Sequence, residues 1–572
     1  MASNLFRSRW SRPTAIAALT FFASSAWAGT GKLAGSLQNA TTTQDVIIQF
    51  TTTANNTILN GITKNGGKFK KNFNHVRSGV FNLPPGIIKQ LSNNPYVKFV
   101  TPVRQIQGNL EFAEPTVGAN IALQYGFDGT GVGVAVLDSG ISPHPDLTDA
   151  SGKSRIVYAQ SFVDGDSSTN DAYGHGTHVA GIIGGNGRQS SGPGFQYTFR
   201  GIAPNANLIN LRVLDANGGG TDAAAIAAID QAIALKDQYN IRVLNLSLGR
   251  MISENYDQDP LCQAVEAAWK AGIAVVVAAG NDGRDNSMGT NGYSTITSPG
   301  NDPFVITVGA MKDMATLGRG DDLIASYSGK GPTLLDHFAK PDLVAPGNGI
   351  VSALAPNSTL ASENPAGVVP TSYYAGSGTA VPNQYMRLNG TSMATPMVAG
   401  AAALLIQKDP SVTPDTIKAR LMATATKNFP ASSVACDSSI NQCFTDYYDL
   451  FTVGAGYLDV MGALNDTEVV PSNLSAQSPQ VTIDQSGTVS LVNSNQVVWG
   501  TQVVWGTQVV WGTQVVWGTS TGTNVVEPTQ VVWGTGTVNG NQVVWGTQVV
   551  WGTQVVWGTN SPFALSIAVK GE

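Results

Sequence analysis

The sequence predicts an α/β fold, with a mostly parallel sheet covered by helices on both faces. Short apolar runs are typical of buried strands, and they occur at residues 132–137, 207–213, 241–245 and 273–279. Longer alanine-rich stretches, typical of helices, occupy residues 222–237 and 393–407. Strands that alternate with helices join into a parallel sheet, because each crossover returns the chain to the same edge.

Length and composition fit a large core and exclude some partners. The chain has 572 residues, 42% of them hydrophobic, so it can bury a large core. Only 12% are charged, and the net charge is −6 with a pI near 5.4. This acidic balance argues against nucleic acid and anionic membranes as partners.

Residues 1–28 are typical of a secretory signal peptide. Arg7, Arg9 and Arg12 precede an apolar run at 15–23, and Ala26-Trp27-Ala28 offers a cleavage site after Ala28. The run is too short to span a membrane, and no later segment reaches that length. We therefore expect a secreted, extracellular protein without a membrane span, or one attached to the cell surface.

Residues 29–108 read as a separate small α+β domain. We expect strands at 45–50 and 96–100 and a helix at 84–92. Basic residues gather here, at Lys68, Lys70, Lys71, Arg77, Lys89 and Lys98. Nucleic-acid binding is one interpretation, but no recognisable nucleic-acid module is present. A domain that covers the acidic remainder of the chain is the favoured interpretation.

Three short motifs supply an acid, a base and a nucleophile. They are Val136-Leu137-Asp138-Ser139-Gly140, Gly174-His175-Gly176-Thr177-His178 and Asn389-Gly390-Thr391-Ser392. A serine hydroxyl attacks an amide only if a neutral imidazole takes its proton, which assigns these roles to Ser392 and His175. A buried carboxylate, Asp138 at a strand end, fixes the imidazole tautomer. Ser392 precedes a helix, where free N–H groups favour negative charge.

A fourth residue completes the set. The strand at 273–279 ends in Gly280-Asn281. The Asn281 amide can donate to a tetrahedral oxyanion together with the Ser392 backbone N–H.

Each motif alone has an ordinary structural explanation. Asp-Ser-Gly and Ala-Gly-Asn are common in turns, and Gly-Thr-Ser is a common helix cap. His175 and His178 could suggest a metal pair, but no glutamate lies between them as in metalloproteases. The joint occurrence, in one order and in matching strand and helix contexts, favours catalysis.

The chain resembles the subtilisin-type serine peptidases of the subtilase family, whose triad runs in this order. The resemblance spans residues 115–462 and includes the motifs at 200–204, 244–249 and 340–347. It implies a subtilisin-like catalytic domain at 109–463, which hydrolyses protein or peptide substrates and needs no cofactor for the chemistry. The matching positions for substrate binding are Gly218, Gly219, Gly220, Ser247, Leu248 and Gly249. Added-strand binding of this kind implies broad specificity.

The resemblance also bears on the propeptide and on calcium. It implies that residues 29–108 are an inhibitory propeptide, cut off between Val103 and Glu114. Many family members bind calcium through a carboxylate matching Asp146 and a loop matching 186–198. Here that loop carries no evident carboxylate, and calcium needs several oxygen ligands. We predict no metal ligand, and structural calcium is left open.

The cysteines are few for an exported protein. Cys436 and Cys443 lie in a polar insertion, where a disulfide fits an oxidising compartment. Cys262 is expected to be a buried apolar residue.

The C-terminal region carries an internal repeat. After a predicted linker at 464–494, the hexapeptide Gln496-Val497-Val498-Trp499-Gly500-Thr501 recurs seven more times within 495–559. A meander of short hairpins and a β-solenoid are both open, and residues 560–572 form a last segment. A row of tryptophans could bind a glycan or cell wall by stacking, or the repeats could be a spacer.

Three functional hypotheses follow. The first is a secreted serine endopeptidase made as a self-processed precursor. The second is a surface or polysaccharide binding protein that acts through its tail. The third is a peptide acyl transferase that uses the same triad.

Overall fold

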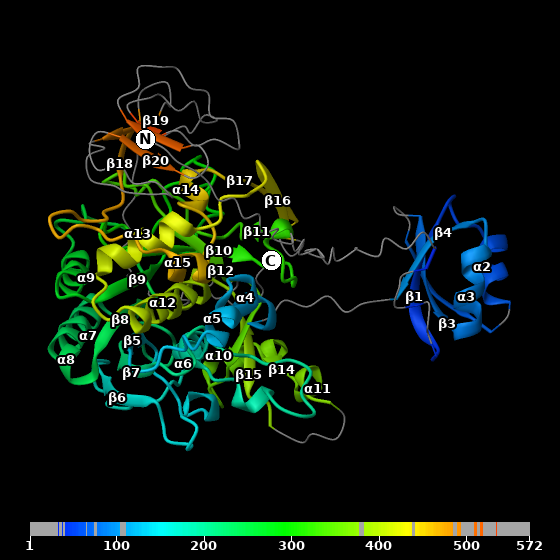
Figure 1. The fold of residues 1–572 in the computed structure, drawn as a ribbon, viewed down its shortest axis with the longest axis horizontal. Coiled ribbons are helices and arrows are strands. Elements are labelled where there is room, and N and C mark those ends of the chain that lie inside the picture. The colour runs from blue at the N-terminus through cyan, green and yellow to red at the C-terminus, as the bar shows by residue number, and fades with distance from the viewer. Residues whose placement is uncertain are drawn as a thin grey trace, which may run out of the picture. The chain divides into compact units, whose positions relative to one another are not determined.

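The computed structural model describes residues 32–33, 37 and 41–483, with gaps at 65, 74–76, 103–109, 377–381 and 438–440. It also describes the short stretches 489–492, 508–511, 515–518 and 533–534. The chain divides into two units, Met1–Ile106 and Gln107–Glu572 (Figure 1). The predicted signal peptide, residues 103–109 of the predicted cleavage segment and most of the repeats lie outside the described residues, whereas residues 110–114 of that segment belong to the helix at Leu110–Thr116.

The first unit is a four-stranded antiparallel sheet with two helices. Its elements are β1 Gln44–Phe50, α2 Asn56–Thr63, β2 Lys68–Phe73, β3 Ser78–Leu83, α3 Pro85–Gln90 and β4 Val97–Pro102. The strand order β2-β3-β1-β4 makes this a split βαβ arrangement. Alternate residues of β1 are buried with the isoleucines of α2 and α3. Successive side chains of a strand point to opposite faces, and only one face of this sheet is covered by the helices. Three of the basic residues lie on β2, an edge strand, where lysines discourage further pairing.

The second unit is built on an eight-stranded sheet of order β11-β10-β9-β8-β5-β7-β6, with β12 also paired to β10. All pairings are parallel except that of β10 with β11. The strands are β5 Gly133–Asp138, β6 Ile156–Ser161, β7 Asn207–Arg212, β8 Ile241–Leu246, β9 Ala274–Ala278, β10 Ile306–Lys312, β11 Leu323–Ile324 and β12 Leu343–Pro346. The predicted parallel α/β sheet is confirmed.

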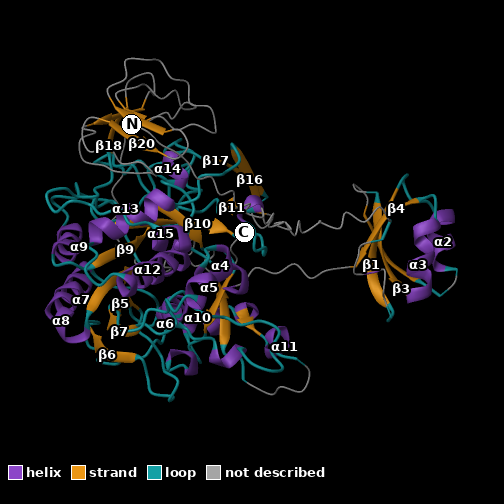
Figure 2. Ribbon diagram, in the orientation of Figure 1, coloured by secondary structure: helices purple, strands orange, loops and turns teal. Residues whose placement is uncertain are grey.

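Helices cover both faces of this sheet, as predicted (Figure 2). α6 and α12 pack together on one face, and α7 packs against α9 on the other. The helices of this unit are α4 Leu110–Thr116, α5 Ala119–Gln124, α6 His175–Gly184, α7 Asp222–Ala234, α8 Lys236–Tyr239, α9 Pro260–Lys270, α10 Thr359–Glu363, α11 Thr371–Tyr374, α12 Thr391–Lys408, α13 Pro414–Thr424, α14 Leu450–Val453 and α15 Val460–Asn465. α12 is buried from Thr391 to Ile406, so it is a central helix that is apolar on every side.

Smaller sheets complete the unit. They are β13 Ile350–Ala353 with β15 Tyr385–Leu388 and β14 Val368–Val369, the hairpin β16 Ser432–Asp437 with β17 Gln442–Tyr447, and the pair β18 Gln480–Ile483 with β19 Val489–Val492. A disulfide joins Cys436 to Cys443, and Cys262 is a buried free thiol, as expected.

The segment that follows α15 packs on the rest of the second unit, although its composition predicted a linker from residue 464. Val470 and Ala476 are buried. The backbone N–H of Val470 donates to Thr416 Oγ1 of α13, and that of Ala476 donates to Asp415 Oδ1. The backbone N–H groups of Ser478 and Val481 likewise donate to the carbonyl oxygens of Pro303 and His337, so we call residues 466–481 the C-terminal strap.

Parts of three repeats, those that begin at Gln508, Gln514 and Gln530, are described in the tail. β20 Gln508–Trp511 pairs antiparallel with β21 Val515–Gly518, and β21 pairs parallel with β22 Trp533–Gly534. The architecture of the whole tail stays a prediction. Within the described part of the chain, no helix has both the length and the apolar character needed to cross a membrane.

Candidate active site

The carboxylate of Asp138 and the imidazole of His175 form a buried pair. Asp138 is the last residue of β5, His175 is the first of α6, and both side chains are 1% exposed. Asp138 Oδ1 lies 2.7 Å from His175 Nδ1. A carboxylate at Nδ1 keeps the proton of the neutral ring on that nitrogen, so Nε2 is the basic atom. His175 Nε2 is buried and has no hydrogen-bond partner.

A second carboxylate, Asp171, holds the start of α6. It accepts hydrogen bonds from the backbone N–H groups of Gly174 at 2.6 Å and Thr177 at 2.7 Å. It also accepts one from the Ser139 hydroxyl at 2.8 Å. Because Ser139 follows Asp138, Asp171 joins the end of β5 to the N-terminus of α6. Sequence analysis missed this residue, although an acidic residue shortly before a helix is a capping signal.

Gly176 allows α6 to approach the strand closely. A Cβ at this position would lie 2.2 Å from the Gly140 carbonyl oxygen and 3.0 Å from Asp138 Cβ. Any side chain here would push the helix away from Asp138 and lengthen the contact between the two functional residues.

The charges around His175 favour its protonated form. Burial lowers the pKa of the imidazole, but the charge and hydrogen bond of Asp138, with the charge of Asp171, raise it above the usual value. A base with a raised pKa takes a proton more readily, which suits general-base chemistry near neutral or higher pH.

Ser392 lies in the first turn of α12, which packs against α6. Its hydroxyl donates to the Ser247 carbonyl oxygen at 3.1 Å, and the Ser247 hydroxyl donates to the Ser392 carbonyl at 2.8 Å. The Ser392 hydroxyl is therefore bound to a backbone carbonyl. Catalytic hydrogen bonds are often unformed without substrate, so this contact is compatible with the predicted role of Ser392 as the nucleophile.

Asn281 is oriented by the residue before the nucleophile. Its Oδ1 accepts hydrogen bonds from the Thr391 backbone N–H at 2.9 Å and from the Thr391 hydroxyl at 3.0 Å. Only the oxygen of an amide can accept an N–H donor, so Nδ2 is the atom left to donate elsewhere. Thr391 thereby fixes the orientation of Asn281, a role that its position in the motif did not reveal.

The predicted substrate-binding residues lie beside these groups. Ser247 contacts Ser392 directly, as described, and Leu248 and Gly249 continue the same segment. A Cβ at Gly249 would lie 2.5 Å from the Thr297 hydroxyl, and one at Gly218 would lie 2.7 Å from the Tyr173 ring. The Tyr173 ring is 6.5 Å from that of His175. Glycine is needed at both positions because the backbone approaches a side chain closely.

His178 serves the fold. Its Nε2 lies 3.1 Å from the Ile350 carbonyl oxygen and 3.0 Å from that of Met386, so this nitrogen carries the proton. Burial and the nearby His175 lower the pKa of His178 to about 3. It is a neutral ring that joins α6 to β13 and β15.

The position that matches a calcium ligand does not fit calcium here. Asp146 Oδ1 accepts the Gln189 backbone N–H at 2.8 Å, and Oδ2 accepts the Tyr385 hydroxyl at 2.6 Å. The Arg155 guanidinium donates to the Asp146 carbonyl oxygen at 2.9 Å. These neighbours are donors and a cation, whereas calcium requires a cage of oxygen acceptors. The described residues hold no group of three or more His, Cys, Asp or Glu able to bind a metal.

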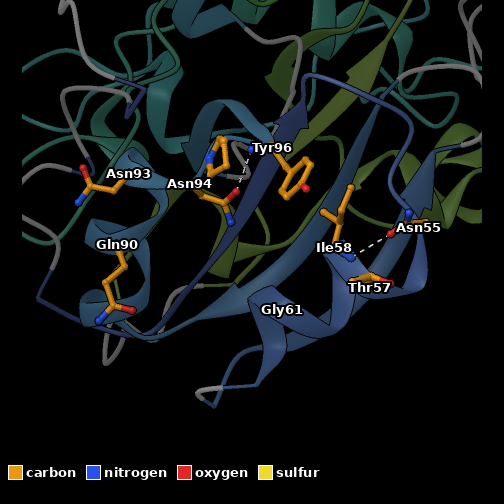
Figure 3. Close-up of a pocket in the computed structure, with 9 residues that line it drawn as sticks. Asn55, Thr57, Ile58, Gly61, Gln90, Asn93, Asn94 and Tyr96 are labelled. Atoms are coloured by element: carbon orange, nitrogen blue, oxygen red, sulfur yellow. Dashed lines mark hydrogen bonds between the residues drawn. The ribbon is translucent and has the colours of Figure 1, made fainter.

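A hollow of about 500 Å³ in the first unit has different chemistry (Figure 3). It lies between α2 and the segment before β4, and Asn55, Gln90, Asn93, Asn94 and Tyr96 contribute to its lining. The amides of Asn55 and Asn94 accept backbone N–H groups at 3.0 and 2.9 Å. Amides of this kind support turns and caps and supply no nucleophile–base pair.

Comparisons with known proteins bear on the family to which the chain belongs. The model of the subtilase family matches residues 129–439, more than half of the chain. Serine protease AprX of Bacillus subtilis is 38% identical over 61% of this chain and 74% of its own length. Subtilisin E of the same organism is 33% identical over 64% of this chain and 80% of its own. A cold-adapted subtilisin-like serine proteinase of known structure is 31% identical over 53% of this chain and 85% of that one, with a TM-score of 0.38. The chain belongs to the subtilase family and is a serine-type endopeptidase.

Proposed function

We propose that the chain is exported and hydrolyses peptide bonds in proteins through Ser392, His175 and Asp138, with Asn281 as an oxyanion donor. The observation that carries the proposal is the buried Asp138–His175 pair, in which His175 Nε2 has no hydrogen-bond partner. A base held in one tautomer with a free nitrogen is what a hydroxyl nucleophile needs.

The proposed reaction uses these contacts. Ser392 Oγ leaves the Ser247 carbonyl, passes its proton to His175 Nε2 and attacks the substrate carbonyl carbon. The oxyanion accepts hydrogen bonds from the Ser392 backbone N–H and from Asn281 Nδ2. His175 then gives the proton to the leaving amine, which breaks the C–N bond and leaves an acyl-enzyme. Water, deprotonated by His175, releases the acid.

Substrate binding, inhibition and export belong to the same proposal. Backbone groups of residues 218–220 and 247–249 would bind the peptide as an added strand, with little discrimination of sequence. The first unit would act as an inhibitory propeptide that is removed by self-cleavage between Val103 and Glu114. The features of residues 1–28 support export.

Comparison of the wild type with Ser392→Ala tests the proposal. We expect the wild type to lose its first unit and digest casein, and the variant to do neither, with a loss on the order of 10⁶-fold in kcat, the value that holds for subtilisin. Intact mass and N-terminal analysis measure the processing. Ser411→Ala, at an exposed serine whose backbone N–H and hydroxyl donate to Asp409 Oδ1, is the matched control and should behave as wild type.

Three other outcomes would redirect the proposal. Full activity in Ser392→Ala would exclude Ser392 as the nucleophile. Ligated or cyclic peptide products from the wild type would favour acyl transfer over hydrolysis. An inert wild type whose residues 495–559 alone bind cell wall would favour the binding-protein hypothesis.

A further inference from the structure

The hairpin β16–β17 contacts the segment that follows Asn281. Asn281 is followed by Asp282, Gly283 and Arg284. Arg284 Nη1 lies 3.1 Å from Asp437 Oδ2, at the end of β16, and the Arg284 guanidinium lies 4.8 Å from the centre of the Phe444 ring on β17. The Arg284 side chain is 4% exposed, so this contact is largely shielded from solvent.

A second contact with the hairpin, made through Lys330, lies one residue closer to Asn281. Lys330 Nζ donates to the Gly283 carbonyl oxygen at 3.2 Å, and it pairs with Asp446 Oδ1 of β17 at 2.6 Å. Both side chains of this pair are at most 4% exposed. A buried pair keeps a fixed geometry, because separation would leave a charge without compensation. Two ion pairs from one hairpin thus fix the backbone just after Asn281.

The opposite side of Asn281 is fixed by α12, through the hydrogen bonds from Thr391. The amide is therefore held between the start of the nucleophile helix and the hairpin. The Cys436–Cys443 disulfide lies between the two strands in register, next to both Asp437 and Phe444. Both cysteines are exposed. A disulfide at this position keeps Asp437 and Phe444, the two residues that contact Arg284, at a fixed distance from each other.

We propose that the β16–β17 hairpin, stapled by the Cys436–Cys443 disulfide, positions Asn281 for oxyanion binding. Asp437 and Asp446 are positioning residues that act through Arg284 and Lys330. The proposal rests on the role of Asn281 given above. An oxyanion donor must meet the charge at a defined point, so loss of the hairpin contacts would lower kcat and leave KM nearly unchanged.

Reduction of the disulfide tests this on the folded wild type. Dithiothreitol gives two electrons to the exposed disulfide, which becomes two thiols while the reagent closes to its cyclic disulfide. We expect kcat on a short peptide amide to fall about tenfold, less than the ~10²–10³-fold loss typical of removing an oxyanion donor. KM should stay within about twofold. The inhibition constant of a peptide boronic acid, whose tetrahedral adduct needs the oxyanion donors, should rise by the same factor as kcat falls.

Variants separate positioning from stability. The double variant Cys436→Ser/Cys443→Ser should show the lowered kcat and no further response to dithiothreitol. Asp437→Asn, at a partly exposed carboxylate, should reproduce the kcat loss with the disulfide intact. Glu266→Gln removes the Glu266–Lys270 pair of α9 and is the matched control, with unchanged kcat.

Asn281→Ala distinguishes failure of this inference from failure of the proposed function. If Asn281→Ala leaves kcat intact, its oxyanion role is wrong. If Asn281→Ala lowers kcat but reduction and Asp437→Asn change neither kcat nor boronic acid affinity, the hairpin has no positioning role, whatever its effect on unfolding temperature.

Discussion

Two buried charge clusters of the catalytic unit differ in how completely they are paired. In the active-site cluster, His175 Nε2 and Asp138 Oδ2 have no hydrogen-bond partner. In the other cluster, Asp342 lies between Lys340 and Lys418, at 2.7 and 3.3 Å. Lys418 also donates to the carbonyl oxygens of Pro303 and Val305 and to the Ser478 hydroxyl, so its ammonium is fully surrounded by acceptors.

The difference separates a site for chemistry from a site for stability. A buried polar atom without a partner is costly, so its presence beside a nucleophile marks a group kept ready for a substrate. The side chains of Lys340, Asp342 and Lys418 have no such atom, and their cluster joins three distant segments, namely α13, the residues just before β12 and the C-terminal strap. We therefore expect mutations in the two clusters to affect different quantities.

The largest expected effect in the lysine cluster comes from Asp342→Asn. Removal of the carboxylate leaves the buried Lys340 ammonium and the Lys418 amine without their shared counter-ion, which costs about 3–5 kcal/mol of unfolding free energy. Urea unfolding in a Ser392→Ala background, where autolysis cannot occur, measures this loss. In the active chain at low temperature, kcat should remain near the wild-type value. A large loss of kcat with normal stability would remove the distinction between the clusters.

The Lys418→Met variant tests the same comparison through the pH dependence of the unfolding free energy. Burial lowers the pKa of Lys418 from 10.5 to about 7, although Asp342 opposes this. Between these values the unfolded state holds a proton that the folded state lacks, so unfolding free energy should rise with pH, by at most about 1.4 kcal/mol per pH unit. Lys418→Met should abolish this part of the rise above pH 7. Identical pH slopes in the parent and the variant would contradict the assignment.

The sequence predicted the parts of both clusters that depend on local pattern. Asp138 at a strand end and Ser392 at a helix start follow from apolar runs and adjacent glycines, which act within a few residues. The bond from Ser139 to Asp171 and the orientation of Asn281 by Thr391 depend on tertiary contacts, which no local pattern reveals.

The C-terminal strap shows the same limit. Its Ser, Asn, Gln and Pro content predicted a linker, because polar segments rarely bury a core. Ser478 instead donates to Asp342 Oδ1 at 2.6 Å, a partner 136 residues earlier in the chain. Composition indicates whether a segment can stay in solvent. It does not show whether a buried acceptor elsewhere in the chain will bind one of its side chains.

A smaller effect is expected from Asp171→Asn, on the pH profile of kcat/KM. The charge of Asp171 contributes to the raised pKa of His175. Activity needs neutral His175 and falls as pH drops through that pKa, so loss of the charge should move the acid limb to lower pH. Asp166→Asn, at a half-exposed carboxylate paired with Arg212, is the matched control. A shift to higher pH, or equal shifts in both variants, would contradict the role given to Asp171.

The smallest expected effect is that of a calcium chelator. Asp146 is buried like the residues of the two clusters, and its oxygens are occupied by Gln189 and Tyr385. Because these donors already supply the positive ends that calcium would supply, the unfolding temperature of the Ser392→Ala protein should be the same with calcium and with EDTA. Tyr385→Phe removes one donor and should lower the unfolding temperature in both solutions. A large drop in EDTA alone would show that another part of the chain binds calcium, or that Asp146 exchanges these donors for the cation.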